Sequence, residues 1–242
     1  KMKVKRLHDH IYLKENRYKK PKEMFKFIER NAFKSTFNKK KELICDIGCA
    51  AGEFLYFLKK EYPHKSFTGV DLRKDLLNKA KRHVSGVKFL KGSVLRKSLF
   101  KKKSFDKIFL IGVHPIFDNF EKCFSNLIYW TKPKGEIYIC DMFNPFAVDV
   151  LIKYKLAENY NSRIFESGWN IFSQKSVSTF LKKNNLIRSF KFKKFEMPFD
   201  LKPQKDPIRS WTIKSNKNRL MINGLSIIQP QTLLTIKLRS FK

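Results

Sequence analysis

Acidic residues are scarce in this chain of 242 residues, which has 21 Asp and Glu against 53 Lys and Arg and a formal net charge of +32. It also lacks any apolar run near the roughly 20 residues needed to span a bilayer. Residues 1–6 are basic with no apolar stretch behind them, so we expect neither a membrane span nor a secretory signal. The four cysteines, Cys45, Cys49, Cys123 and Cys140, form no C-x-x-C pair. We therefore predict reduced thiols in a cytoplasmic protein with no metal site.

The positive charge is concentrated at the two ends of the chain. Residues 1–41 hold 15 basic against 4 acidic residues, and residues 182–242 hold 15 against 3. Such a charge suits nucleic acid, an acidic membrane surface or an anionic small substrate, or it reflects a Lys-rich composition without a function of its own, and composition alone leaves these alternatives open. Hydrophobic residues, among them 24 phenylalanines, make up 42% of the chain, which is enough for the core of one decorated domain.

The chain is organised around a strand, a small-residue loop and a helix at residues 43–61. The apolar run 43–47 suits a strand buried in a parallel sheet, and apolar residues recur at helical spacing from Glu53 onwards. Between them lies Gly48-Cys49-Ala50-Ala51-Gly52. Glycines let the backbone turn tightly, and the first helical turn offers unpaired N–H groups and a positive dipole end. This arrangement is typical of loops that bind a nucleotide-bearing cofactor.

A second strand, residues 66–70, ends at Asp71, 19 positions after Gly52. An acid in this position is placed to accept hydrogen bonds from both ribose hydroxyls of a nucleoside. The spacing strengthens the interpretation of the loop, because glycine alone is common in α/β turns for backbone reasons. A nicotinamide enzyme is disfavoured, since its loop would read G-x-G-x-x-G and this one reads D-x-G-x-A-x-G.

Residues 46–52 and 69–72 resemble motifs I and II of the class I S-adenosylmethionine-dependent methyltransferases, and residues 87–93, 104–111 and 130–140 resemble their later strands in order. The resemblance spans about 42–145. It implies S-adenosyl-L-methionine as cofactor. Two positions depart from the family pattern: Ala50 replaces a glycine, and Ser93 replaces the acid that often accepts from the adenine amino group. The cofactor-binding residues it implies are Asp46, Gly48, Cys49, Ala50, Gly52, Asp71, Leu72, Ser93, Val94, Gly112 and Val113.

Strands and helices alternate, which predicts an α/β, Rossmann-like methyltransferase fold with helices on both faces of a seven-stranded, mostly parallel sheet. We expect an antiparallel last strand at 232–239, a sixth strand at 190–199, and an inserted β-hairpin at 200–230 between them. Residues 1–41 are predicted to form an N-terminal helical cap, and residues 42–242 the methyltransferase domain. The predicted elements of the core are 43–47, 53–61, 66–70, 73–83, 87–90, 105–111, 118–130 and 136–141.

Beyond the fifth strand, Asn144 and Pro145 suit the start of a helix over 146–160, followed by an irregular stretch with Trp169 and a helix over 174–184. The inserted hairpin covers the pocket as a lid or contacts a second copy of the chain, and the sequence does not decide between them.

His114 follows the fourth strand, where binding sites of such sheets lie, and it is the candidate general base. The alternative is a histidine that packs or hydrogen-bonds around the cofactor. By the resemblance, the cap residues Tyr12, Arg17 and Tyr18 face the substrate, and the alternative is that they form part of a solvated basic face that covers the sheet. Arg209 and Trp211 of the insertion are further candidates for holding an anionic or carbohydrate substrate, against a merely packed tryptophan.

Three functions follow from these observations. The first is a methyltransferase acting on a small polar or anionic metabolite, with a sugar or sugar acid as the first choice. The second is an RNA methyltransferase, favoured by the charge. Against it, lysines outnumber arginines by 42 to 11, which suits a solvated surface better than bidentate phosphate recognition, so we predict only weak, non-specific nucleic-acid binding. The third is a cofactor-binding interaction protein without catalysis.

Overall fold

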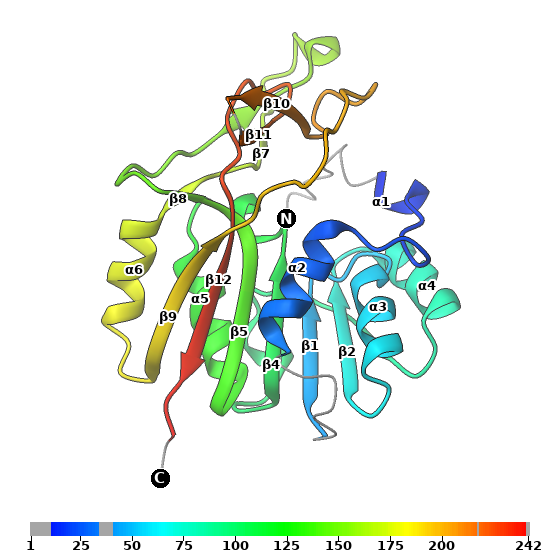
Figure 1. Ribbon diagram of the computed structural model, residues 1–242, viewed down its shortest axis with the longest axis vertical. Helices are drawn as coiled ribbons and strands as arrows, with labels where there is room; N and C mark the ends of the chain where they lie inside the picture. Colours follow the sequence, from blue (N-terminus) through cyan, green and yellow to red (C-terminus); the bar gives the residue numbers. More distant parts are fainter. Residues whose placement is uncertain (1–10, 34–40, 217, 241–242) are drawn as a thin grey trace.

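The computed structural model describes residues 11–33, 41–216 and 218–240 (Figure 1). Its centre is a sheet with the strand order β3-β2-β1-β4-β5-β12-β9. The first five of these are β1 (Leu43–Ile47), β2 (Ser66–Asp71), β3 (Lys88–Lys91), β4 (Phe105–Ile111) and β5 (Thr131–Asn144), and they pair in parallel. β12 (Gln231–Leu238) lies antiparallel between β5 and β9 (Ile187–Lys194). The predicted fold class is confirmed.

Helices cover both faces of the sheet, as Figure 1 shows. One face packs on α2 (Glu23–Ala32), α3 (Glu53–Glu61) and α4 (Lys74–His83), and the other on α5 (Glu121–Trp130) and α6 (Gln174–Lys182). Neighbouring strand residues point to opposite faces, so Phe109 belongs to the first cluster while Ile108 and Leu110 belong to the second. Burial on both faces explains why the central strands β1 and β4 are mostly apolar.

The N-terminal segment adds α1 (Ile11–Lys14) and α2, joined by a connector. α2 buries Phe25, Ile28 and Ala32 against the sheet and α3. The predicted cap also included residues 1–10 and 34–40, which lie outside the described residues. Over the part of the chain that the structure describes, no helix is long and apolar enough to cross a membrane.

The predicted helix over 146–160 is wrong. β5 continues to Asn144, and the Asn144 side chain then folds over the following turn: its Oδ1 accepts from the Phe146 N–H (3.1 Å), and its Nδ2 donates to the Val148 carbonyl (2.8 Å). Asparagine often makes this local turn in place of a helix cap. The chain then forms a short antiparallel pair, β6 (Lys153–Tyr154) with β7 (Glu166–Ser167), before β8 (Phe172–Ser173) pairs with the end of β5.

The inserted hairpin is present as β10 (Trp211–Ser215) and β11 (Asn218–Ile222), which pair antiparallel. The sixth strand, β9, begins and ends earlier than predicted, at Ile187–Lys194, and β5 begins earlier, at Thr131. The hairpin and the β6–β7 pair lie beyond the same end of the sheet, which is the end where the parallel strands finish (Figure 1). This end of the molecule therefore carries all the additions to the plain fold.

Candidate active site

A cavity of about 890 Å³ lies at the carboxyl end of the parallel strands. Its lining comes from the glycine loop, the ends of β2, β4 and β5, the N-terminal segment, and the insertion. Ligands of doubly wound sheets bind at this edge, because the strand order reverses there and the following loops diverge. Of the predicted cofactor residues, all but Gly52 line the cavity.

The glycine loop is shaped by positive backbone angles. Gly48 has φ +79°, and a Cβ built on it would lie 2.3 Å from Cγ2 of Val113, so only glycine fits beneath that side chain. Gly52, at φ +76°, precedes α3 and packs against Phe89, which explains why it is a glycine although it does not line the cavity. Ala50 also has a positive φ of 45°, and its N–H donates to Asp71 Oδ2 at 2.9 Å.

Asp71 is fixed by two backbone donors, since its Oδ1 accepts from the Arg73 N–H (2.8 Å) and its Oδ2 from Ala50. A carboxylate offers about four lone-pair sites, so this side chain keeps acceptor capacity toward the cavity that it lines. The loop and the end of β2 are thus held in one fixed arrangement by the acid itself. The departure at Ala50 leaves this contact intact, because the contact uses the backbone N–H.

Asp46, at the end of β1, is buried and lines the cavity, and its Oδ1 has no hydrogen-bond partner among the described residues. Burial, and then the negative charge of Asp71, raise the pKa of Asp46 to about 8. A buried carboxyl oxygen without a donor is costly, so a ligand that brings an N–H or cationic group to this point satisfies it. This is the clearest sign that the cavity is built for a bound group.

His114 lies away from the cavity lining and is fully buried. Its ring stacks on Phe143 with centroids 4.7 Å apart, and its Nδ1 lies 3.0 Å from Asp141 Oδ2. The same carboxylate oxygen accepts from the Val113 N–H at 2.9 Å. The position in sequence after β4 suggested a group facing the substrate, but the short 3-10 helix at His114–Ile116 turns this side chain into the core. His114 thus approaches Asp141 from the core, although neither of its ring nitrogens has a hydrogen-bond partner among the described residues.

The N-terminal segment is held on the glycine loop by polar contacts. The Arg17 N–H donates to Glu53 Oε1 (2.7 Å), and the Tyr18 hydroxyl donates to the Ala51 carbonyl (2.8 Å). Tyr18 also stacks on His83 at 4.7 Å, and it does not line the cavity. The structure thus uses the ring of Tyr18 to hold the segment, and Tyr18 facing the substrate remains a prediction without support from the cavity lining. Tyr12 and Arg17 do line the cavity.

The insertion meets the N-terminal segment through Arg209. Its guanidinium pairs with Glu15, a buried residue that also pairs with Lys22 at 2.7 Å. Burial would raise the pKa of Glu15, but the two cations outweigh it and hold the pKa below its usual value. Arg209 lines the cavity as expected. Trp211 does not, and its expected place in the cavity wall is taken by Trp169.

Sequence reasoning missed much of the upper cavity wall. Four of the five methionines of the chain, Met24, Met142, Met197 and Met221, line it, and they come from four distant parts of the sequence. Glu15, Glu53 and Asp141 were missed as well. No pattern along the chain marks these residues, because each is brought to the cavity by a different element. Among the described residues, no group of three or more His, Cys, Asp or Glu side chains is arranged to hold a metal ion.

A parallel sheet with a glycine loop after β1 and a fixed acid after β2 defines an α/β enzyme that binds a nucleoside-bearing cofactor. A family model described as a methyltransferase domain matches residues 38–194, and the chain belongs to this family. It is a methyltransferase, as the motifs predicted.

Known proteins agree with this assignment. The chain is 29% identical over 122 residues to a malonyl-[acyl-carrier protein] O-methyltransferase of Halalkalibacterium halodurans, and the match covers 48% of this chain and 43% of that protein. A methyltransferase from Archaeoglobus fulgidus has the same fold, with a TM-score of 0.58 at 18% identity over 95% of this chain and all of the other. A phosphoethanolamine N-methyltransferase 2 of Haemonchus contortus, solved with S-adenosylhomocysteine, gives a TM-score of 0.56 at 16% identity over 78% and 43% of the two chains.

Proposed function

We propose that this methyltransferase transfers a methyl group from S-adenosylmethionine to a small amphiphilic acceptor with an apolar body and an anionic group. One observation carries the proposal: methionine and aromatic side chains line the cavity together with cations, and we assign the former to its acceptor part and the latter to its rim. Methionine adapts to irregular apolar ligands, and Trp169, Phe199 and Leu201 extend the same apolar wall. A sugar, our first choice from sequence, would leave its hydroxyls unpaired on such a wall.

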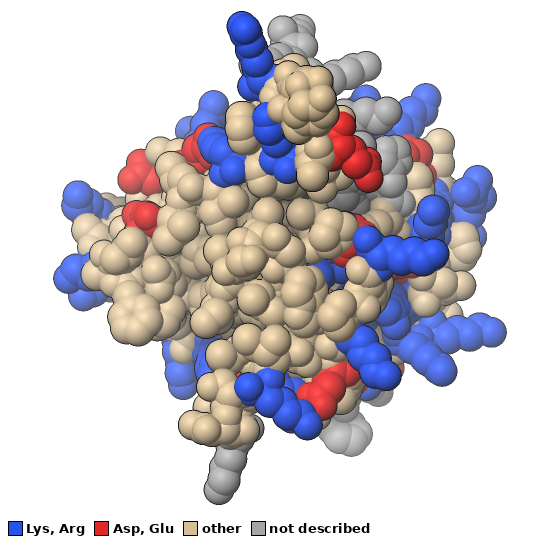
Figure 2. All heavy atoms as spheres, turned by 90° about the horizontal axis from the view of Figure 1, so that it is seen from above, with Lys and Arg blue, Asp and Glu red and all other residues tan. Residues whose placement is uncertain are grey.

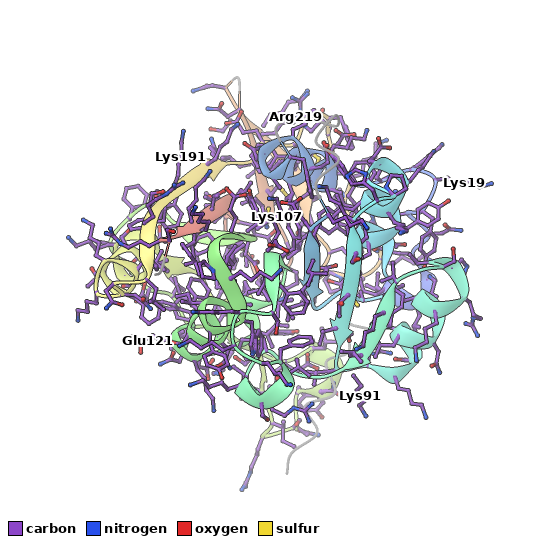
Figure 3. All side chains as sticks on the ribbon, turned by 90° about the horizontal axis from the view of Figure 1, so that it is seen from below. Lys19, Lys91, Lys107, Glu121, Lys191 and Arg219 are labelled. Carbon is purple, nitrogen blue, oxygen red and sulfur yellow. The ribbon has the colours of Figure 1, made fainter. Side chains whose placement is uncertain are left out.

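The anionic part of the predicted acceptor is supported by the rim. Arg17, Lys19 and Lys20 line the mouth of the cavity, and their side chains have no acidic partner among the described residues. Figure 3 shows Lys19 extending outward at the edge of the molecule. Arg209 and Lys22, by contrast, are already paired with Glu15. The rim therefore offers free positive charge where the interior offers apolar surface, which is the division that an amphiphile requires.

The residues present fit the cofactor. Asp71 is proposed to hold the ribose hydroxyls, Ser93 and Val94 the adenine, and the unpartnered Oδ1 of Asp46 the amino end of the methionine part. Gly112, at φ +68°, has open space where a Cβ would stand, so the backbone itself can approach the ligand. When bound, S-adenosylmethionine supplies a methyl group already activated on a sulfonium.

Because the methyl donor is reactive, the chain contributes mainly orientation. The acceptor nucleophile has to lie in line with the donor, and a fixed cavity supplies this more cheaply than free encounter. Asp141 holds the loop after β4 by its bond to the Val113 N–H, and His114 supports Asp141 from the core. We assign His114 a positioning role in place of the predicted base. The apolar wall excludes water from the reacting groups.

The test compares acceptors that differ in one property. The purified protein is assayed for methyl transfer from labelled S-adenosylmethionine to a medium-chain fatty acid or aryl-alkyl acid, to the corresponding neutral alcohol, to a sugar acid and to short RNA. The anionic amphiphile is expected to give the highest kcat/KM. Arg17→Gln should raise KM for it about tenfold, the loss of one charge-assisted contact, while the matched surface variant Lys91→Gln should not. A sugar acid or RNA as the best acceptor would refute the proposal.

A second variant tests the apolar wall. Met197→Gln keeps the length of the side chain but places a polar amide on the wall, so KM for the amphiphile should rise while S-adenosylhomocysteine affinity stays unchanged. Equal loss of both would place Met197 at the cofactor and contradict the division of the cavity that we propose.

A further inference from the structure

Large apolar side chains are exposed at one end of the molecule. Among the described residues, eleven large hydrophobic side chains are exposed. Six belong to the segment between β5 and β8, namely Phe146, Val148, Leu151, Tyr160, Ile164 and Phe165. Three more, Phe199, Ile213 and Ile228, belong to the insertion. Both segments lie beyond the carboxyl end of the parallel strands, where the cavity also lies (Figure 1). We call these nine residues the apical apolar surface.

Several of the exposed side chains belong to a loop that hydrogen bonds hold in place. In residues 155–165, the Lys155 ammonium donates to the carbonyls of Tyr160 (2.6 Å) and Ser162 (3.0 Å) and lies 5.1 Å from the centre of the Phe165 ring. The Ile164 N–H donates to the Ser162 hydroxyl at 3.0 Å. These bonds fix the loop while Tyr160 and Ile164 remain more than 70% exposed. Holding such side chains in water is unfavourable unless something covers them.

The arrangement of charged and uncharged residues at this end indicates which kind of partner the apical apolar surface fits. Seen from above, this end shows a broad central surface of uncharged residues with Lys and Arg gathered around it and fewer Asp and Glu (Figure 2). A second copy of the chain is disfavoured, since each copy carries a net charge of +32 and the two would repel. RNA would use the basic residues and aromatic rings, but not the aliphatic tips Val148, Leu151 and Ile164. A bilayer with anionic headgroups uses both the cations and the aliphatic tips.

We propose that the apical apolar surface docks on the surface of an anionic membrane, with the loop 155–165 inserted at the level of the headgroups. The choice of a bilayer rests partly on the proposed function, because an amphiphilic acceptor resides in membranes and the cavity lies at the same end. Arg163, an exposed residue beside Ile164, is placed to contact lipid phosphates while its neighbours enter the apolar layer. The protein would thus collect its acceptor from the surface on which it docks.

The experiment must detect penetration of the loop 155–165 into the bilayer, because so basic a protein adsorbs to any anionic surface through its charge alone. Ile164→Trp and, at the opposite end of the sheet, Leu43→Trp are prepared in the full chain and mixed with vesicles of phosphatidylcholine, with and without about 30% phosphatidylglycerol. We expect the emission of Ile164→Trp to shift to the blue and to be quenched by brominated lipid, with no such changes for Leu43→Trp, both measured as differences from the wild-type protein. Equal responses at the two positions would show adsorption without insertion and would overturn the proposal.

A triple variant, Tyr160→Ser, Ile164→Ser and Phe165→Ser, should bind anionic vesicles about tenfold or more weakly in flotation, most visibly at 0.3 M salt where the charge contribution is screened. These three residues do not line the cavity, so S-adenosylhomocysteine affinity and turnover of a dissolved acceptor should not change. If the variant instead abolishes a dimer seen in sedimentation, or loses RNA affinity while keeping vesicle affinity, a bilayer is the wrong partner. Absent turnover in the wild type would refute the proposed function and leave the vesicle result standing.

Discussion

The two ends of the central sheet differ in whether the buried acids on or beside their strands are paired with cations. At the end where the parallel strands begin, Glu42 pairs with Lys65 (2.7 Å) and Lys107 (2.8 Å), and Glu136 pairs with Lys107 and Lys237. Figure 3 looks onto this end, with Lys107 near its centre. At the end where the strands finish, Asp46 is buried with an unpartnered oxygen. The carboxylates of the first end are paired, whereas the second end leaves one buried carboxyl oxygen without a partner among the described residues.

The pKa values follow the same division. Burial would raise the pKa of Glu136, but hydrogen bonds from Lys237 and Tyr138 and the charge of Lys107 outweigh it and bring the pKa down to about 2. Burial raises the pKa of Asp46 to about 8, because no cation is near enough to offset it. A buried carboxylate with partners belongs to the structure, whereas one without partners marks a site where binding energy is available.

The largest effect is expected from breaking the paired end. Glu42→Gln leaves Lys65, whose side chain is 2% exposed, without its carboxylate. Removing one partner of a buried ion pair costs about 3 kcal/mol or more of unfolding free energy. Chemical denaturation should show this loss, while calorimetry shows unchanged S-adenosylhomocysteine affinity in the folded variant. A loss of affinity without a loss of stability would contradict the division between the two ends.

Asp71→Ala, at the end where the parallel strands finish, should change cofactor affinity more than stability. It removes the acceptor proposed for the ribose hydroxyls, and we expect cofactor affinity to fall by about 1.5–3 kcal/mol, the range for charge-assisted hydrogen bonds. Isothermal calorimetry with S-adenosylhomocysteine measures it, and Asp75→Ala, an exposed neighbour, is the control. Wild-type affinity in Asp71→Ala would remove Asp71 from the cofactor site.

Alanine substitutions at two glycines distinguish the cost of backbone strain from the cost of a steric clash. Gly48 and Gly112 have similar positive φ angles, so alanine costs about 1–2 kcal/mol of strain at either position. At Gly48 the new methyl group also collides with Val113, whereas at Gly112 it enters open space. Thermal unfolding should therefore show the greater loss of stability for Gly48→Ala. Equal losses would mean that Val113 moves aside without cost.

A further effect is a change of slope with pH. The folded protein holds a proton on Asp46 that the unfolded chain releases above about pH 4, so the unfolding free energy of the ligand-free protein falls as pH rises toward 8. Asp46→Asn removes this contribution and should flatten the decline across that window. Asp75→Asn should leave it unchanged, because hydrogen bonds from Arg73 hold the pKa of Asp75 below its usual value. An identical slope in Asp46→Asn and the wild type would refute the raised pKa.

The sequence by itself determined the fold and the edge of the cavity that the loop 48–52 and Asp71 form. The apolar runs of β1, β4 and β5, the loop at residues 48–52 and the acid at Asp71 are local patterns, and a parallel sheet converts such patterns into fixed positions at one edge. The hairpin was predictable for the same reason, since its turn and its strands are neighbours in the chain.

Only the tertiary structure decided which side chains line the cavity. Tyr18 and His114 looked functional from their positions, yet one fastens the N-terminal segment and the other packs on Phe143. The methionine wall and the Glu15–Arg209 pair join residues far apart in the chain, so no periodicity records them. The end of β5 shows the same limit: Asn144 and Pro145 suit a helix start, but strand pairing carries the chain through Asn144, and its side chain then closes a turn. Local patterns fix the backbone of an element, whereas the direction of a loop side chain is set by whatever packs around it.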